Sequence, residues 1–289
     1  MGLKSKLSEA WGTEPMIIRR KEIDELSADI RRIIDGHALD LRDNLEGRLS
    51  ILKNDIHTLA GRLNNQADAL QQEKIALANT LADISHQLKT PLTAMGVMID
   101  LLENAPPKKA TEFITNLKQG LTQTKWLVSA LLKMAKLESG SAGFSQGKIA
   151  ANELLALALQ PLGVLLDIKD QHVKLEGDTV FYCDKNWTAE ALTNIIKNAS
   201  EHSPAGSAIT VEVGDTPLAN WITVSDTGKG IPVEKMKSLF QRFKGQGTGI
   251  GLPLALAIMQ EQNGDIEVNG GGHGKGAAFT LKFYSKIKI

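Results

Sequence analysis

A leucine-rich heptad repeat constrains the first part of this 289-residue chain most strongly. Apolar residues follow at alternating steps of four and three, at Leu45, Leu49, Leu52, Ile56, Leu59, Leu63 and Leu70. Gln66 fills the missing place between Leu63 and Leu70, and the register continues to Leu77. Because such a seam is buried only against a partner helix, the repeat predicts one helix over residues 45–102, dimerised along its length. The alternative is an intramolecular helical hairpin, which is less favoured because the seam is so long.

A histidine lies on the polar side of this helix. His86 is two positions from both Ile84 and Leu88, so at the helical angle per residue it lies nearly opposite the apolar stripe. Thr90, one turn later, shares its face, and Pro91 removes a backbone donor and favours a local bend. A lone exposed histidine is usually a surface residue without a role, so its meaning depends on the second half of the chain.

Composition excludes several classes of protein. Lys plus Arg and Asp plus Glu are equal at 33 each, so no basic surface indicates a nucleic-acid partner. A single cysteine, Cys183, excludes an internal disulfide and a cysteine-based zinc site, and it fits a reducing compartment. The longest apolar run, residues 154–166, is interrupted by Gln160 and Pro161 and is short for a membrane span. We therefore expect a cytoplasmic chain, compatible with the cytosolic part of a membrane-anchored sensor whose upstream segment lies outside it.

The remaining pattern predicts an α+β chain. The stretch Asn104–Pro107 ends the first helix, and a second amphipathic helix runs to Ser139, so two hairpins in a dimer form a four-helix bundle. After a Gly/Ser-rich linker at 139–147, a mixed α/β domain of about 140 residues follows. Its predicted helices are 151–166, 186–201 and 250–262, and its predicted strands are 171–175, 179–183, 207–213, 221–225, 265–269 and 277–284.

The helix over 186–201 carries a polar strip. Glu190, Asn194 and Asn198 recur at steps of four and therefore stack on one side. Amide oxygens are hard ligands suited to Mg²⁺ alongside nucleotide phosphates and water. Two mid-helix asparagines alone are more often simply solvated.

Two glycine-bearing loops follow predicted strands. In the first, Asp226 precedes Gly228 and Gly230, where a carboxylate can accept a hydrogen bond from the adenine amine and the glycines let the backbone approach the base. The second, Gly245–Leu252, opens a helix, and a glycine-rich loop at a helix N-terminus offers free N–H groups to phosphates. Its spacing fits neither a P-loop nor a dinucleotide fingerprint.

Together these stretches, in this order, resemble the phosphoacceptor, asparagine and two glycine motifs of the sensor histidine kinases of two-component systems. The segment Leu239–Phe243 resembles the phenylalanine motif of the same family. The resemblance extends from about residue 75 to the C-terminus, and it implies three parts: signal-relay helices over 1–74, a dimerisation and phosphotransfer hairpin over 75–140, and an ATP-binding α/β sandwich of the histidine kinase/gyrase type over 148–289.

The resemblance also implies roles for particular residues. ATP would bind the second domain, with Asp226 reading adenine and Asn198, helped by Asn194, holding Mg²⁺. His86 would take the γ-phosphoryl group and pass it to a response-regulator aspartate, and Thr90 would position water for a phosphatase reaction. The full nucleotide-binding set comprises Asn194, Asn198, Asp226, Gly228, Gly230, Gly247, Thr248, Gly249, Gly251 and Leu252. Partners would be a second copy of the chain and a receiver domain.

Three departures from the family pattern keep alternatives open. Glu201-His202 replace a Lys/Arg-aromatic pair. Gln87 stands where many relatives carry a carboxylate base, and only three residues separate Phe243 from Gly247, so the lid over ATP would be short. A catalytically weak, nucleotide-binding scaffold is therefore one alternative. A hydrolysing ATPase of the same nucleotide fold is another, but such enzymes carry a water-activating glutamate where this chain has Asn194, which disfavours it.

Overall fold

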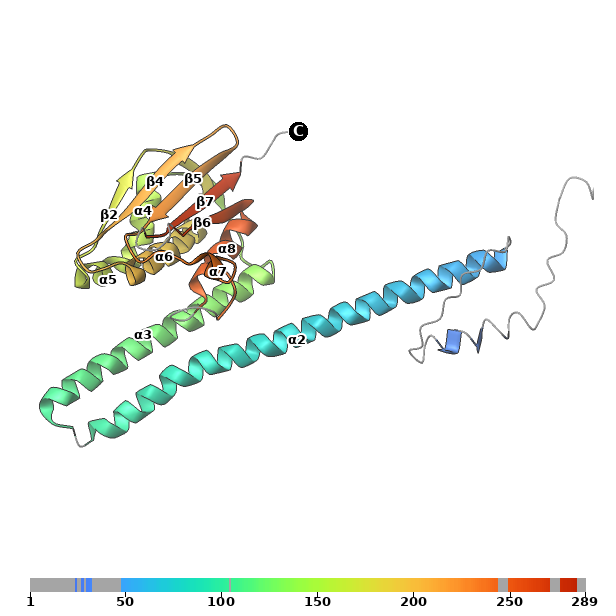
Figure 1. Ribbon diagram of the computed structural model, residues 1–289, viewed down its shortest axis with the longest axis horizontal. Coiled ribbons are helices and arrows are strands. Elements are labelled where there is room, and N and C mark those ends of the chain that lie inside the picture. Colours follow the sequence, from blue (N-terminus) through green and yellow to red (C-terminus); the bar gives the residue numbers. More distant parts are fainter. Residues whose placement is uncertain are drawn as a thin grey trace, which may run out of the picture. The chain divides into compact units, whose positions relative to one another are not determined.

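A computed structural model describes residues 24, 27–28, 30–32, 48–103, 105–243, 249–270 and 276–284 (Figure 1). The chain divides into two compact units, Met1–Leu81 and Ala82–Ile289. The described positions between 24 and 32 are helical. Leu45, at the start of the predicted heptad helix, lies outside the described residues.

The heptad segment forms one uninterrupted helix, α2 (Arg48–Leu102), which contains Pro91. The continuous helix predicted from the repeat is thereby confirmed over the described residues. No described residue covers its seam, since Leu59, Leu63 and Leu70 are 58%, 56% and 58% exposed. A helix with so much exposed leucine leaves its apolar seam available to a partner.

A second helix, α3 (Pro107–Glu138), runs back along the end of α2. It begins at a proline, which the first helical turn tolerates because its N–H would be unpaired there. The two helices approach closely where Gly120 faces Met95, since a Cβ on Gly120 would lie 3.0 Å from the Met95 Cγ atom. The predicted helical hairpin is therefore present.

The α/β domain after α3, for which the sequence predicts nucleotide binding and which we call the nucleotide domain, is built on a five-stranded mixed sheet (Figure 1). Its spatial order is β2 (His172–Glu176), β4 (Ala208–Asp215), β5 (Ala219–Ser225), β7 (Ala278–Tyr284) and β6 (Gly264–Asn269). Only the β2–β4 pair is parallel among these strands. Strand residues alternate between buried and more exposed positions, so one face of the sheet makes the core. The six predicted strands are confirmed, with bounds shifted by a residue or two.

Helices cover the buried face of this sheet in one layer: α4 (Ala151–Leu159), α6 (Lys185–His202) and α8 (Gly251–Glu261) (Figure 1). A short helix, α7 (Val233–Met236), follows the Asp226 loop. The core between helices and sheet is tightly closed, since Leu192, Leu254 and Phe279 are at most 1% exposed. The fold predicted from the sequence, a helical stalk followed by an α/β domain, is confirmed.

The predicted helix over 151–166 is interrupted. Pro161 ends α4, and a 3₁₀ turn, η1 (Gln160–Leu162), leads into α5 (Gly163–Ile168), because proline cannot donate the next helical hydrogen bond. Among the described residues, 151–168 is the one stretch whose length and mean hydropathy of 1.4 would suffice for a membrane span. Here it packs with α6 as part of the domain core.

The predicted linker at 139–147 is shorter than expected. Residues 146–150 form strand β1 (Gln146–Ala150), antiparallel to β3 (Val180–Asp184), because backbone pairing outweighs the low strand propensity of Gly147.

The chain before β1 is also anchored at both sides. Ser141 N donates to the Lys136 carbonyl at the end of α3, while Trp187 Nε1 of α6 donates to the Ala142 carbonyl at 3.2 Å. Gly140 and Gly143 have φ values of 66° and 60° on either side of this point.

Candidate nucleotide-binding site

Asp226 lies at the end of β5 and is only 8% exposed. Its Oδ1 accepts hydrogen bonds from the N–H groups of Gly228 at 2.8 Å and Ala277 at 3.1 Å. In the described part of the chain, both hydrogen bonds to this carboxylate are accepted by Oδ1. A fixed, buried carboxylate whose second oxygen is free for a ligand can accept from the exocyclic amine of a base.

The loop after Asp226 is closed by glycines at points where no side chain fits. A Cβ on Gly228 would lie 2.5 Å from the carbonyl oxygen of His202, at the end of α6. Gly276 has φ 71°, and its Cβ would overlap the Asp226 carbonyl oxygen at 1.8 Å. The predicted Gly228 thus lies against Asp226, and Gly230 follows it in the same loop. Gly276 is an addition that the sequence motifs did not indicate.

Helix α6 is fixed in position by its N-cap. The Asp184 carboxylate accepts from the N–H groups of Asn186 and Trp187, at 2.9 and 3.0 Å, and its other oxygen accepts from Ser145 N at 2.7 Å. Capping of this kind satisfies backbone donors that the first turn leaves free. The carboxylate therefore links the entry of the domain to the helix that carries the asparagines.

Asn194 holds a buried oxygen without a partner. The residue is 3% exposed, and its Nδ2 donates to the Glu190 carbonyl at 2.8 Å, whereas Oδ1 has no hydrogen-bond partner. An unpaired buried acceptor costs about 1–3 kcal/mol, so this oxygen is well suited to a cation, water or ligand donor. Asn198, one turn later, is half-buried.

The same oxygen faces the start of α8. A Cβ on Gly251, the first residue of that helix, would lie 3.0 Å from Asn194 Oδ1. Among the described residues no side chain caps this N-terminus, so its first backbone N–H groups can be offered to an anion. Gly249, with φ 62°, and the half-buried Leu252 adjoin Gly251 in the chain. The other two predicted phosphate-binding residues, Gly247 and Thr248, lie outside the described residues.

These donors suit magnesium better than a transition metal. The described part of the chain holds no group of three His, Cys, Asp or Glu side chains that could hold a metal ion. A hard cation that keeps water and phosphate oxygens in its shell needs only one or two protein oxygens. The orphaned amide oxygen of Asn194 fits that requirement, and Asn198 lies on the same helix one turn away.

Helix α3 contacts this site through residues that sequence reasoning did not select. The indole of Trp126 lies beside Gly251, with Cη2 3.4 Å from the position of a Gly251 Cβ. Lys197 Nζ lies 3.9 Å from the centroid of the Trp126 ring, and Lys133 Nζ is 2.6 Å from Glu190 Oε2. Burial lowers the pKa of the Lys197 ammonium, against an opposing effect of Glu201. No spacing pattern on α3 marks Trp126, so its contact with this site has no local signal in the sequence.

His86 is exposed on α2, as the apolar periodicity predicts. One turn later, Thr90 is also exposed, and its hydroxyl donates to the His86 carbonyl at 3.1 Å. The neighbouring Gln87 is half-buried. The imidazole is therefore open to approach by a second domain.

Two family models match the chain, one around His86 and one around the nucleotide site. The model described as His Kinase A (phospho-acceptor) domain matches residues 76–140. The model described as histidine kinase-, DNA gyrase B-, and HSP90-like ATPase matches residues 183–286. The chain belongs to the sensor histidine kinases.

Sensor histidine kinases of known sequence match over long stretches. The chain is 31% identical over 171 residues to the swarming motility regulation sensor protein RssA of Serratia marcescens, covering 56% of this chain and 36% of that protein. It is 28% identical over 249 residues to the sensor histidine kinase WalK of Bacillus subtilis, covering 82% of this chain and 39% of that protein. The chain thus spans well under half the length of these curated relatives.

Solved structures of histidine kinases share the fold. The Acinetobacter baumannii histidine kinase AdeS aligns with a TM-score of 0.59 at 23% identity, over 69% of this chain and 97% of that one. The histidine kinase ThkA, solved in complex with the response regulator protein TrrA, aligns with a TM-score of 0.62 at 18% identity, over 77% of this chain and 66% of that one. At these identities the likeness establishes the architecture of this sensor histidine kinase.

Proposed function

We propose that this chain is a protein-histidine kinase that transfers the γ-phosphoryl group of ATP to His86 and then to an aspartate of a response regulator. The observation that carries the proposal is the buried, unpaired Asn194 Oδ1 beside the uncapped start of α8. A cation-binding oxygen next to free backbone donors is suited to a nucleotide triphosphate. The buried Asp226 carboxylate supplies the adenine contact in the same domain.

The chemistry requires an accessible imidazole. A lone pair on a ring nitrogen of His86 attacks the γ-phosphorus, an N–P bond forms, and the bond to the β-phosphate oxygen breaks, so that ADP leaves with the electron pair. The other ring nitrogen then loses its proton. Neutral imidazole offers such a lone pair near neutral pH. Transfer of this kind depends chiefly on positioning and on neutralisation of phosphate charge.

Mg²⁺ would be held by Asn194 and Asn198 and would neutralise phosphate charge when bound. Gly249, Gly251 and Leu252, with Gly247 and Thr248 outside the described residues, form the proposed phosphate segment. Gln87 has an amide, which accepts a hydrogen bond but takes no proton at neutral pH. In our proposal the proton from His86 therefore passes to water.

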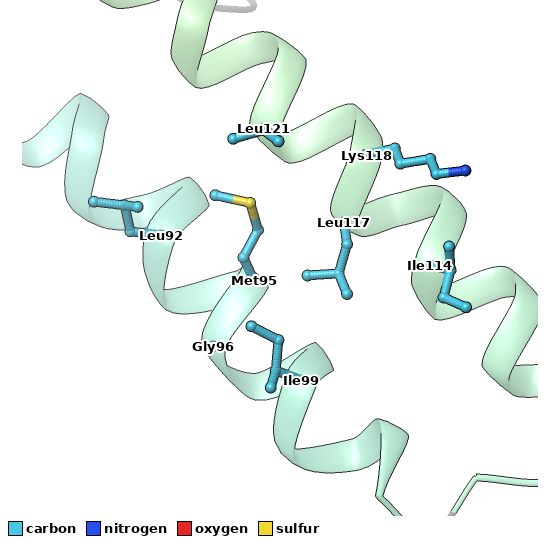
Figure 2. A pocket seen from close by; sticks show the side chains of 8 residues that line it. All are labelled: Leu92, Met95, Gly96, Ile99, Ile114, Leu117, Lys118 and Leu121. Atoms are coloured by element: carbon cyan, nitrogen blue, oxygen red, sulfur yellow. The ribbon is translucent and has the colours of Figure 1, made fainter.

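A second copy of the chain covers the apolar groove between α2 and α3 in this proposal. Figure 2 shows the groove, of about 450 Å³, with side chains from both helices. It is lined by Leu92, Met95, Gly96, Ile99, Ile114, Leu117, Lys118 and Leu121. Ile99 and Leu121 are 57% and 48% exposed, so two such hairpins would bury one another in a four-helix bundle.

The response regulator is the proposed second partner. His86 and Thr90 lie exposed one turn apart, which leaves room for a receiver domain and is compatible with a phosphatase reaction in which Thr90 positions water. The proposed division is a signal-relay segment over 1–74, a phosphotransfer hairpin over 75–140 and an ATP-binding domain over 148–289. These parts would act in the cytoplasm, downstream of a sensor.

Incubation with γ-labelled ATP tests the proposal. We expect an acid-labile, alkali-stable label on the protein that is absent in His86→Gln and passes to a receiver domain. Release of inorganic phosphate without protein label would identify a hydrolysing ATPase instead. Nucleotide binding with neither label nor hydrolysis would identify a signalling scaffold.

A further inference from the structure

The α3 helix packs directly against the nucleotide domain. Leu127, Ala130, Met134 and Leu137 are each at most 5% exposed and belong to the same core cluster as α6 and α8. These residues sit at successive turns of one helix face and so form a continuous contact. The part of α3 that follows Trp126 is thus docked along the domain.

Trp126 begins this contact at the phosphate side of the proposed nucleotide site. Its Cη2 atom and Asn194 Oδ1 lie 3.4 and 3.0 Å from the same point, the position that a Gly251 Cβ would occupy. The indole therefore adjoins both the orphaned oxygen and the uncapped first turn of α8.

The charged residues that flank Asn194 on α6, Glu190 and Lys197, contact side chains of α3. Glu190 pairs with Lys133, and the Lys197 ammonium lies over the Trp126 ring. Lys197 also lies 3.8 Å from Glu201, and its side chain is 28% exposed. A lysine ammonium is a compact cation on a flexible stem that binds phosphate as a point charge. A tryptophan face attracts the same ammonium through its quadrupole.

We propose that Lys197 binds the nucleotide phosphates and that Trp126 of α3 competes with those phosphates for it. This inference rests on the proposed nucleotide site. It gives this chain a phosphate-binding cation on α6 one turn before Glu201, and it makes nucleotide binding and docking of α3 oppose each other. Undocking frees Lys197, and a bound nucleotide holds the lysine and weakens the α3 contact.

Calorimetric titration of the full chain with MgAMPPNP and with adenosine tests both parts. We expect Lys197→Ala to weaken MgAMPPNP binding about tenfold, as for loss of a hydrogen bond to a charged group, and to leave adenosine binding unchanged. Lys197→Arg should retain most of the affinity. Lys185→Ala removes an exposed charge from the first turn of the same helix and should have no effect. An unchanged MgAMPPNP affinity in Lys197→Ala would overturn the phosphate role.

The competition is measured with Trp126→Ala. This substitution should tighten MgAMPPNP binding about fivefold, within the range of a cation–π contact, and it should have no such effect in the Lys197→Ala background. Tightening of equal size in both backgrounds would overturn competition for the lysine. If the unmodified chain bound neither MgAMPPNP nor adenosine, the nucleotide site and this inference would both fail. Binding that Asp226→Ala abolishes, with Lys197→Ala silent, would overturn the inference alone.

Discussion

The helical hairpin and the nucleotide domain differ in how they bury their apolar residues. Every buried residue in the described part of the chain lies at or after Leu127, so none lies in α2 or in the first part of α3. The nucleotide domain encloses its own core, whereas α2 exposes large apolar residues such as Leu63 and Ile99. Within the described residues, the first region therefore leaves apolar surface for a partner, as in the proposed dimer, whereas the second region encloses its core within this chain.

The contrast extends to polar groups. In the nucleotide domain, the described buried side-chain atoms without a partner are Asn194 Oδ1 and Ser203 Oγ. In the hairpin, by comparison, His86 and Thr90 are simply exposed. Because nearly all buried polar groups of the domain are satisfied, each orphaned oxygen is a candidate position for a ligand or an ordered water.

The largest expected effect comes from a charge in the hairpin groove. Ile99→Asp should weaken dimerisation roughly a thousandfold or more, because each of two copies would bury a carboxylate at several kcal/mol. Analytical ultracentrifugation measures this shift. Val97→Asp is the matched control, since Val97 is 52% exposed but does not line the groove. Equal dimerisation of the Ile99→Asp protein would show that another surface covers α2.

Two leucine substitutions, one in each region, should differ in how their effect on stability depends on protein concentration. Leu254→Ala, in the closed core, should reduce the free energy of unfolding by about 2–5 kcal/mol, independently of protein concentration. Leu63→Ala, on α2, should lower stability by an amount that depends on concentration, because its cost arises in the dimer. Thermal unfolding over a hundredfold range of concentration separates the two. A concentration-independent loss in Leu63→Ala would place its partner within the same chain.

A substitution on the hairpin should change the reaction rate without changing the free energy of unfolding. Gln87→Glu supplies a base for the His86 proton and should raise the rate of autophosphorylation about tenfold, a modest part of the usual contribution of general bases. The rate of label incorporation from γ-labelled ATP measures it, and Gln87→Met is a control that offers no base. An unchanged or lower rate in Gln87→Glu would count against a missing base.

The smallest effect is expected where α3 meets the nucleotide domain at its surface. Arg242 forms an ion pair with Glu138, with side chains 38% and 53% exposed. Arg242→Gln should therefore cost less than about 1 kcal/mol in thermal unfolding. Met134→Ala, in the buried part of the same contact, should cost about 2–5 kcal/mol. Equal costs would mean that charge, rather than apolar packing, holds α3 to the domain.

Periodicity predicted most of the fold because most of it is local. The heptads of α2 and the alternation in β4 and β5 are properties of short windows. The same reasoning missed β1, whose pairing with β3 depends on residues thirty or more positions away. It also extended one helix through Pro161, where η1 intervenes.

The candidate site was predictable as far as its motifs are contiguous. Asp226 and its glycines share one loop, and Asn194 and Asn198 share one helix, so spacing alone groups them. The contact between Trp126 and Lys197 joins two helices far apart in the sequence, and nothing in either local pattern requires it. Which asparagine has the unpaired oxygen also depends on packing, because Asn194 is buried and Asn198 is not.

The anchored connection between α3 and the nucleotide domain limits how that domain could move if α3 undocked. Ser141 is fastened to the end of α3 and Ala142 to Trp187 of α6, with glycines at 140 and 143. Such a connection could allow rotation, but it could lengthen very little. The nucleotide site would then reach successive points along the helical hairpin by rotation about residues 140–143, at a nearly constant distance from them.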